Sequence, residues 1–239
     1  MFVRRIHSSK LSFSKVVPTN LKGKKKSSQE WLTRQLNDPF VERAKMANYR
    51  CRSAFKLLEI DQKYNIIKPG FTVIDCGAAP GSWSQIAVKQ SNADGSSPGK
   101  PRGTVIGVDL LQIYPIEHAT LLGNTDFTRP ESQDKIRSLL ADKRIDCVLS
   151  DMAPNATGVR SLDQENIITL CYSVLRFAIL MSSPNASLLM KVWDNGEVPA
   201  LEKNIQRYYR QVKRIKPRAS RADSAENFVL ARGFVGVER

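Results

Sequence analysis

A lysine and an aspartate lie at the ends of strongly apolar segments, where charged side chains are unusual. Asp151 directly follows the run 145–150, and Lys191 lies inside the run 187–192. Burying a lone ammonium is costly, so Lys191 needs a partner or a chemical task. Desolvation and a neighbouring cation lower the pKa of a lysine from its usual value of about 10.4, whereas a nearby carboxylate raises it. A transiently neutral Lys191 could therefore act as a general base toward a hydroxyl group.

Two more charged residues can reach the same place. Lys56 lies on a predicted helix that precedes the first strand, and Glu226 opens the last predicted strand. If that strand runs antiparallel to its neighbours, its start lies on the same rim of the sheet as Asp151 and Lys191. A structural salt bridge is the alternative for each of these charges, and it suits Glu226 best.

The segment 73–83 is typical of a strand, a turn of small residues and the start of a helix. Small residues let the backbone approach a ligand closely, and a helix N-terminus offers unpaired N–H groups. The G-x-G-x-x-G pattern of dinucleotide-binding turns is absent, because Ala79 and Ser82 occupy two of its glycine positions. Pro80 also removes an N–H donor.

Two aspartates at the ends of the following strands complete a predicted nucleoside pocket. Asp109 could accept hydrogen bonds from both hydroxyls of a ribose, and Asp126 could accept one from an adenine amino group. Either residue could instead form a turn, and Trp83 could be a core residue. A nucleoside pocket without a pyrophosphate site fits S-adenosylmethionine. The predicted cofactor-binding residues are Gly77, Pro80, Gly81, Ser82, Trp83, Asp109, Asp126 and Asp151.

Strands and helices alternate along the chain, which predicts a parallel, doubly wound α/β sheet with helices on both faces. We expect strands at 72–76, 104–109, 120–122, 145–150, 187–192, 211–215 and 227–231. We expect helices at 31–36, 48–64, from about 83, and at 130–141, 162–181 and 200–208. The stretch 91–102 is rich in Ser, Gly and Pro and predicts a mobile loop. Ligands of such sheets bind beyond the carboxyl ends of the strands.

The charge balance favours a polyanionic partner. The formal net charge is +14, which makes nucleic acid the first candidate and a lysine-rich soluble surface the alternative. Arg50 and Arg52 form a basic edge beside the predicted site, and we expect them to contact RNA phosphates. A second basic cluster precedes Glu226 and consists of Arg210, Lys213, Arg214, Lys216, Arg218 and Arg221.

The first 29 residues are basic and contain no acidic residue, since the first one is Glu30. Such a segment resembles a mitochondrial transit peptide. The alternatives are a basic arm that holds RNA and a nuclear signal built on 24–26. We therefore divide the chain into a transit-like segment, 1–29, and a single domain, 30–239.

Other classes of site have little support. The four cysteines form no C-x-x-C pair and there are two histidines, so we expect no metal site. Free cysteines within apolar runs favour a reducing compartment. No apolar stretch is long enough to span a bilayer.

These motifs together resemble the FtsJ/RrmJ family of ribose 2'-O-methyltransferases. The matching segments are 49–57, 75–85, 108–111, 151–155, 189–193 and 220–228, and the resemblance covers nearly all of 30–232. The resemblance implies a seven-stranded Rossmann-like sheet with the last strand antiparallel, and a catalytic tetrad of Lys56, Asp151, Lys191 and Glu226. It is strongest for mitochondrial members that modify a uridine of large-subunit ribosomal RNA and support ribosome assembly. Ser82 and Phe228 depart from the residues that are frequent in the family.

The resemblance implies a partner and a place as well as a reaction. We expect ribosomal RNA or a precursor of the large ribosomal subunit as the partner, a monomer as the working form, and the mitochondrial matrix as the compartment. In the reaction Lys191 would be the base, Lys56 would depress its pKa and hold the ribose or phosphate, and Glu226 would position the hydroxyl or Lys56. Asp151 would orient Lys191 near the reacting end of the cofactor. The rival hypotheses are a nicotinamide-dependent oxidoreductase, a non-catalytic ribosome assembly factor, and the same chemistry on another RNA.

Overall fold

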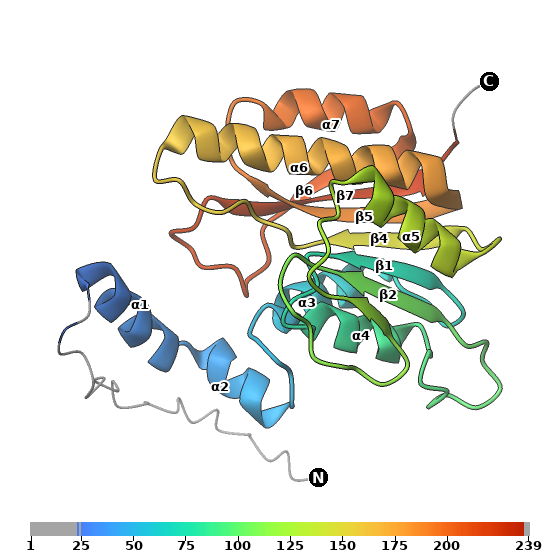
Figure 1. The fold of residues 1–239 in the computed structure, drawn as a ribbon, viewed down its shortest axis with the longest axis horizontal. Helices are drawn as coiled ribbons and strands as arrows, with labels where there is room; N and C mark the ends of the chain where they lie inside the picture. The colour runs from blue at the N-terminus through green and yellow to red at the C-terminus, as the bar shows by residue number, and fades with distance from the viewer. Residues whose placement is uncertain (1–22, 24, 237–239) are drawn as a thin grey trace, which may run out of the picture.

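Strands of almost uninterrupted apolar character build the centre of the molecule, as expected of parallel strands that are covered on both faces. The computed structural model describes residue 23 and residues 25–236 (Figure 1). Its strands are β1 (Thr72–Cys76), β2 (Thr104–Val108), β3 (Thr120–Leu122), β4 (Ile145–Ser150), β5 (Ser182–Trp193), β6 (Tyr209–Ile215) and β7 (Glu226–Phe234). They form one seven-stranded sheet in the order β3-β2-β1-β4-β5-β7-β6. β7 runs antiparallel to both β5 and β6, which confirms the predicted fold class.

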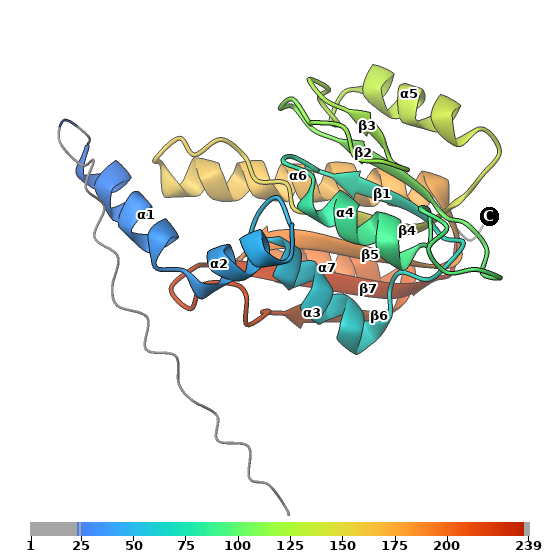
Figure 2. The ribbon, with the colours of Figure 1, turned by 90° about the horizontal axis from the view of Figure 1, so that it is seen from below.

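Side chains that alternate along each strand supply two apolar cores, one on each face of the sheet. Val73 of β1 packs with α3 (Ala54–Tyr64) and α4 (Ser82–Gln90). Ile74 faces the other way, toward α5 (Pro130–Leu140), α6 (Arg160–Met181) and α7 (Val198–Gln206). Figures 1 and 2 show these two helical layers on opposite sides of the sheet.

The N-terminal part of the described chain differs from the prediction. A helix α1 (Lys26–Leu36) is followed by a second helix, α2 (Pro39–Met46), which the sequence analysis missed. Asp38 caps α2 by accepting a hydrogen bond from the backbone N–H of Phe40, and Pro39 occupies its first turn. Aspartate followed by proline thus starts a helix as well as ending one. The predicted transit-like segment lies mostly outside the described residues, and its expected boundary at residue 29 falls within α1.

Three other segments differ from expectation. The predicted helix 48–64 begins only at Ala54. β5 starts at Ser182, immediately after α6, although Pro184 and Asn185 are typical of a turn. The stretch 91–102 is also better ordered than a mobile loop. Asn92 is buried, and its amide donates hydrogen bonds to the carbonyls of Ser97, Lys100 and Pro101 at 3.1–3.2 Å.

Candidate active site at the carboxyl rim of the sheet

Four charged side chains from four different elements meet at the carboxyl rim. Lys56 Nζ of α3 lies 2.7 Å from Glu226 Oε2, at the start of β7. Lys191 Nζ of β5 lies 3.0 Å from Asp151 Oδ1, directly after β4, and 3.9 Å from the same Glu226 oxygen. Lys191 Nζ also donates a hydrogen bond to the backbone carbonyl of Asp151 at 2.7 Å. The sequence predicted all four residues, and the structure brings them into one continuous cluster.

The topology explains how residues so far apart in the chain converge. β4 and β5 are parallel, so Asp151 and Lys191 both lie near their carboxyl ends. β7 is antiparallel, so its first residue, Glu226, pairs with Trp193 at the end of β5. Because α3 packs on this face of the sheet, Lys56 reaches the same rim.

Two serines hold the carboxylates of the cluster. Ser53 Oγ donates to Asp151 Oδ2 at 2.7 Å, and Ser220 Oγ donates to Glu226 Oε1 at 2.7 Å. Trp83 fixes the first of them, because its indole Nε1 donates to the carbonyl of Ser53 at 2.9 Å. The sequence analysis did not single out Ser53 or Ser220, and only their position within the matching segments could have drawn attention to them.

The cluster is balanced in charge and mostly removed from water. The side chains of Lys56 and Lys191 are 9% and 11% exposed, and those of Glu226 and Asp151 are 12% and 15% exposed. Two ammonium groups face two carboxylates, so removal of one partner leaves a charge uncompensated at a cost of about 3–5 kcal/mol. Such a cluster holds its members in fixed positions, which suits a step that needs a proton acceptor at a defined place.

A hollow of about 480 Å³ adjoins the cluster and shares Asp151 with it. It lies between the end of β1, the residues after β2 and β3, and the segment 151–155, with Gly77, Asp109, Asp126 and Asp151 in its wall. Its lining contains three carboxylates and no lysine or arginine. This volume is within the usual range for small-molecule sites, about 300–1,000 Å³. An acidic lining suits a cationic nucleoside cofactor such as S-adenosylmethionine and disfavours a pyrophosphate.

The backbone around Gly77 leaves room for this hollow. Gly77 has a φ of 79°, and a Cβ at this position would lie 2.6 Å from Met152 Cγ. Gly77 and Met152 both line the hollow. Any larger residue at Gly77 would therefore have to displace the wall of the hollow.

The two strand-end aspartates are oriented by backbone N–H groups. Asp109 accepts hydrogen bonds from the N–H groups of Ala79 and Leu111, both at 2.8 Å. Asp126 accepts from the N–H and the hydroxyl of Thr128, and these bonds lower the pKa of Asp126. Both carboxylates also line the hollow, so the roles of turn former and ligand acceptor coexist in each residue.

Four predicted cofactor residues lie outside the lining of this hollow. Gly81, with a φ of 118°, faces Arg50 and Ile116, and Ser82 Oγ lies 2.9 Å from Cys51 Sγ. Trp83 is buried against Phe228. For Pro80, Gly81, Ser82 and Trp83, a direct cofactor contact stays a prediction. The sequence analysis missed other lining residues on the segment 151–155 and on α6, namely Met152, Asn155, Asn166 and Thr169.

The two arginines expected to hold RNA are engaged within the protein. Arg50 donates to the carbonyls of Pro80, Tyr114 and Pro115 at 2.6–2.8 Å. Arg52 donates to the carbonyl of Ala219 at 2.6 Å, and its Nε lies 2.8 Å from a carboxylate oxygen of Asp38. Their main role in this structure is to tie segments together, and RNA contact by either stays a prediction.

A fully buried carboxyl group lies on β1, which ends at the site. Asp75 of β1 is fully buried and accepts a hydrogen bond from Ser84 Oγ at 2.6 Å. Burial, followed by the charges of Asp151 and Asp109, raises the pKa of Asp75 to about 7. Among residues 23 and 25–236, no group of three His, Cys, Asp or Glu side chains could hold a metal ion.

Comparison with known proteins identifies close relatives. Residues 49–234 match the family model described as FtsJ-like methyltransferase. The Drosophila melanogaster protein named "rRNA methyltransferase 2, mitochondrial" is 61% identical over 94% of this chain and 90% of its own length. The Parvibaculum lavamentivorans protein named "Ribosomal RNA large subunit methyltransferase E" is 45% identical over 88% of this chain and 83% of its own. A crystal structure from Plasmodium falciparum, described as a ribosomal RNA methyltransferase, shares the fold with a TM-score of 0.69 at 24% identity, covering 79% of this chain and 100% of its own.

Proposed function

The chain belongs to the FtsJ-like methyltransferase family, and from this membership we propose that it methylates the ribose 2'-hydroxyl of a uridine in mitochondrial large-subunit ribosomal RNA. The methyl donor is S-adenosylmethionine, the cofactor of this family. The observation that carries the proposal is that the acidic hollow and the charged cluster adjoin each other. Asp151 lines the acidic hollow and also pairs with Lys191 in the buried charged cluster.

The residues of the cluster divide the work of moving one proton. S-adenosylmethionine supplies a methyl group on a positively charged sulfur, which a hydroxyl oxygen can attack in line. Lys191, in its neutral form, would take the proton from the ribose hydroxyl while that oxygen receives the methyl group. Asp151 orients Lys191 through two contacts at 2.7 and 3.0 Å. Glu226 holds Lys56, whose ammonium binds the ribose or its phosphate.

The rival activities fit these residues less well. An oxidoreductase that uses a dinucleotide needs a place for a pyrophosphate, and the three carboxylates in the hollow would repel it. A non-catalytic assembly factor has no need to keep two lysines and two carboxylates in contact at low exposure, since such clusters are weak stabilisers.

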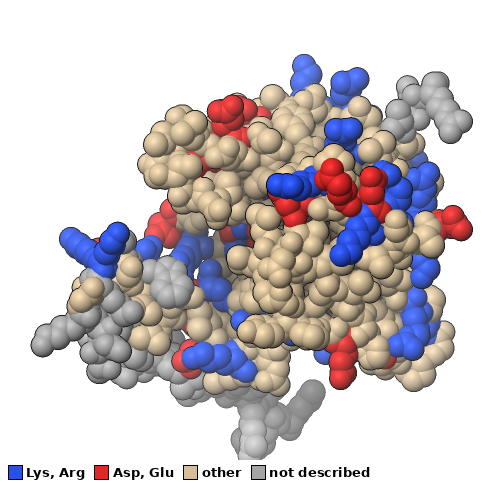
Figure 3. All heavy atoms as spheres, in the orientation of Figure 1, with Lys and Arg blue, Asp and Glu red and all other residues tan. Residues whose placement is uncertain are grey.

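The finer parts of the proposal concern compartment and partner. The basic, acid-free segment 1–29 and the name of the Drosophila relative support a mitochondrial location, with the matrix as the compartment. We propose a precursor of the large ribosomal subunit as the natural substrate and a monomer as the active form. In Figure 3 lysine and arginine side chains line the recess between α1 and the sheet, in front of the carboxyl rim, where RNA would approach. No helix in the described part of the chain has the length and hydropathy needed to cross a membrane.

The test replaces Lys191 with alanine. Ribose methylation is mapped in mitochondrial ribosomal RNA from cells that carry either the intact protein or Lys191→Ala, and cofactor binding is measured on the purified proteins. We expect the variant to lose one ribose methylation, and its turnover in vitro to fall by at least about 100-fold, while cofactor affinity changes little. Lys191→Met, which keeps much of the side-chain volume, should behave alike.

Lys89→Ala is the matched control, because Lys89 is an exposed lysine on α4 that forms no ion pair in the described residues. Near-normal turnover of Lys191→Ala would show that Lys191 is not the base. An unchanged methylation map would exclude mitochondrial ribosomal RNA as the substrate.

A further inference from the structure

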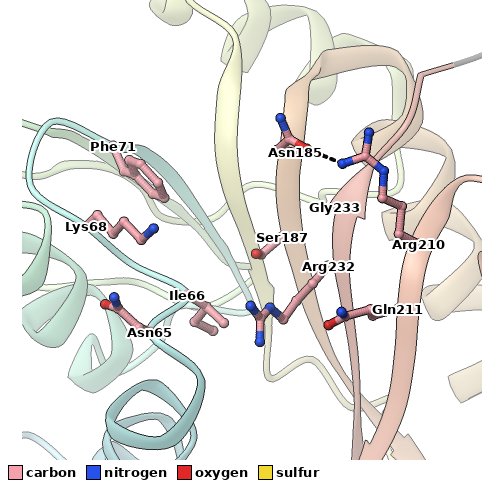
Figure 4. A pocket seen from close by; sticks show the side chains of 10 residues that line it. All are labelled: Asn65, Ile66, Lys68, Phe71, Asn185, Ser187, Arg210, Gln211, Arg232 and Gly233. Carbon is pink, nitrogen blue, oxygen red and sulfur yellow. Dashed lines mark hydrogen bonds between the residues drawn. The ribbon is translucent and has the colours of Figure 1, made fainter.

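A second hollow lies at the opposite rim of the sheet, away from the candidate active site. It has a volume of about 260 Å³ and opens between the end of α3, the start of β5 and the neighbouring ends of β6 and β7 (Figure 4). Lys68 and Arg232 reach into it from opposite sides, and Gln211 also points toward its centre. None of the residues that line it is acidic.

The sheet is left uncovered at this place by the early end of α3. Leu230 of β7 pairs with Leu189 of β5 and is buried under α3 and α4. One row further along the same face, Arg232 pairs with Ser187. α3 ends at Tyr64, and the chain turns away at Asn65, which has a φ of 50°. The helical layer therefore stops before the row of Arg232, and this row faces the hollow instead of an apolar core.

The positive charges in this hollow have no acidic partner within the described residues. Lys68 and Arg232 form no ion pair, and Arg210 donates only to the neutral side chain of Asn185, at 2.8 Å. The carboxylates of the flanking helices are already occupied. Asp61 of α3 is buried and accepts the N–H groups of 66 and 67, and Glu202 of α7 pairs with Arg214.

An uncompensated cluster of cations in a concave surface attracts anions. The guanidinium fork of Arg232 matches the oxygens of a phosphate, and the ammonium of Lys68 adds a second charge. The side chains of Ser187 and Gln211 offer further donors at the edge of the hollow. This set of donors fits one phosphate group better than a carboxylate-bearing small molecule, since it supplies more N–H groups than a carboxylate can accept.

Exposed cations also connect this hollow with the active rim along β6, the edge strand of the sheet. Arg210 lies at its start, Lys213 lies in its middle, and Lys216 and Arg218 follow its end. The ammonium of Lys213 lies 5.8 Å from the centre of the Tyr64 ring and forms no ion pair with a described residue. Seven residues of β6 span roughly 20 Å, a distance that a nucleic-acid backbone covers with several phosphates. Arg214 is not part of this line, because it pairs with Glu202 and Asp194.

We propose that the hollow at Lys68 and Arg232 binds a backbone phosphate of the RNA substrate, and that the RNA follows the β6 edge from there to the candidate active site. This inference rests on the proposed function, because it takes the substrate of that function as the ligand. The contact would lie at the rim of the sheet opposite the candidate active site, and it would position RNA of any sequence.

The experiment measures RNA binding by the full chain as a function of salt. The dissociation constant for a large-subunit ribosomal RNA fragment is determined over a series of KCl concentrations for the intact protein and for Lys68→Ala/Arg232→Ala. Each lost phosphate contact should lower the slope of log K against log salt by about 0.7–0.9. We expect a slope lower by about one for the double variant, several-fold weaker binding at low salt, and unchanged cofactor affinity. Lys213→Ala should give a smaller change of the same kind.

Lys89→Ala/Arg137→Ala is the matched control, since it also removes two positive charges, one from the exposed Lys89 on α4 and one from the exposed ion pair of Arg137 with Asp134 on α5. If the double variant and this control have the same slope as the intact protein, the proposed RNA contact is wrong. If the slope is unchanged but stabilisation of the fold by inorganic phosphate is lost, the hollow binds a free phosphate and the RNA contact is again wrong.

Methyl transfer by the intact protein to the same fragment is measured in parallel, which separates this inference from the proposed function. A lower slope in the double variant without methyl transfer by the intact protein would support the phosphate site and contradict the reaction. Methyl transfer by the intact protein, together with an unchanged slope in the double variant, would support the reaction and contradict the phosphate site.

Discussion

The hydroxyl groups of Ser53 and Ser220 each occupy one oxygen of a carboxylate in the charged cluster. The remaining oxygens, Asp151 Oδ1 and Glu226 Oε2, face the two lysines. Each serine therefore fixes which oxygen is available to the ammonium groups. Neither hydroxyl needs to touch RNA or cofactor for this, so we regard Ser53 and Ser220 as positioning residues.

Replacing Ser53 by alanine tests this role. The loss of the hydrogen bond to Asp151 Oδ2 should lower kcat by about 5- to 20-fold, corresponding to roughly 1–2 kcal/mol, and should leave the KM for RNA nearly unchanged. The pH–rate profile should shift, because the carboxylate that orients Lys191 has lost a donor. Ser53→Thr, which keeps the hydroxyl, should restore most of the rate.

Ser138→Ala is the control, since Ser138 is exposed on α5 and its hydroxyl donates to the backbone carbonyl of Asp134. A purely structural role of Ser53 would lower the melting temperature without moving the pH–rate profile of the folded enzyme.

Two contacts join elements close to the hollow that shares Asp151 with the charged cluster. Asp75 links β1 to α4 through Ser84, and Arg50 links the loop after β1 to the segment 114–115. The first contact involves a buried carboxyl group, and the second uses three backbone carbonyls. Each makes a separate prediction about the stability or the binding of the molecule.

The carboxyl group of Asp75 makes stability depend on pH. Burial raises its pKa from 3.8 to about 7, so the folded state keeps the proton to a higher pH than the unfolded state does. Its contribution to stability is complete below about pH 4 and is lost as the pH rises to about 7, by on the order of 4 kcal/mol. In urea unfolding, Asp75→Asn should therefore lose less stability between pH 4 and 7 than the intact protein does. Parallel curves for the two proteins would contradict this role.

Arg50→Ala should loosen the loop 78–81, in which Ala79 lines the hollow that shares Asp151 with the charged cluster. Without the guanidinium the loop 78–81 and the segment 114–115 lose their common donor, so the affinity for S-adenosylmethionine should fall several-fold in calorimetric titration. The salt dependence of RNA binding should stay the same, because the guanidinium is already occupied. Arg50→Lys keeps the charge but not the three donors, and it should be nearly as weak for the cofactor. Normal cofactor binding with a lower RNA salt slope would instead support the RNA contact predicted from the sequence.

Over the whole molecule, the sheet was predictable because most of its strands are short apolar runs in the sequence. β1, β3 and β4 were predicted with the bounds that the structure has. β1 and β4 are buried almost throughout, which makes them short apolar runs in the sequence. The charged cluster was predictable because the ends of parallel strands converge. α2 was missed because proline is typical of a helix end, whereas Pro39 lies in the first turn of a helix that Asp38 caps.

The tasks of the arginines could not be predicted, since their partners are distant in sequence. Arg50 and Tyr114, for example, are 64 residues apart, and the partner is a backbone carbonyl that carries no residue signature. Distant partners also separate the members of the second basic cluster into paired and unpaired side chains. Arg214 and Arg221 meet carboxylates from other elements, at 2.8 and 3.5 Å, whereas Lys213 does not.

The division into a targeting segment and one catalytic domain is also a prediction about the whole chain. Residues 1–29 fused to a fluorescent protein should carry it into mitochondria, because the segment is basic and free of acidic residues. The control fusion carries glutamate in place of Arg4, Arg5 and Lys10 and should remain outside the organelle. Nuclear accumulation of the first fusion would favour the signal at 24–26 instead.

The strand β7 carries Glu226 at one end and Arg232 near the other, and both side chains stand on the same face because their numbers share the same parity. A single inserted or deleted residue between them would turn one of these side chains to the opposite face while the other kept its place. The distance and relative orientation of Glu226 and Arg232 are thus set by one uninterrupted stretch of β7. Insertions and deletions between Glu226 and Arg232 should therefore be avoided in this family.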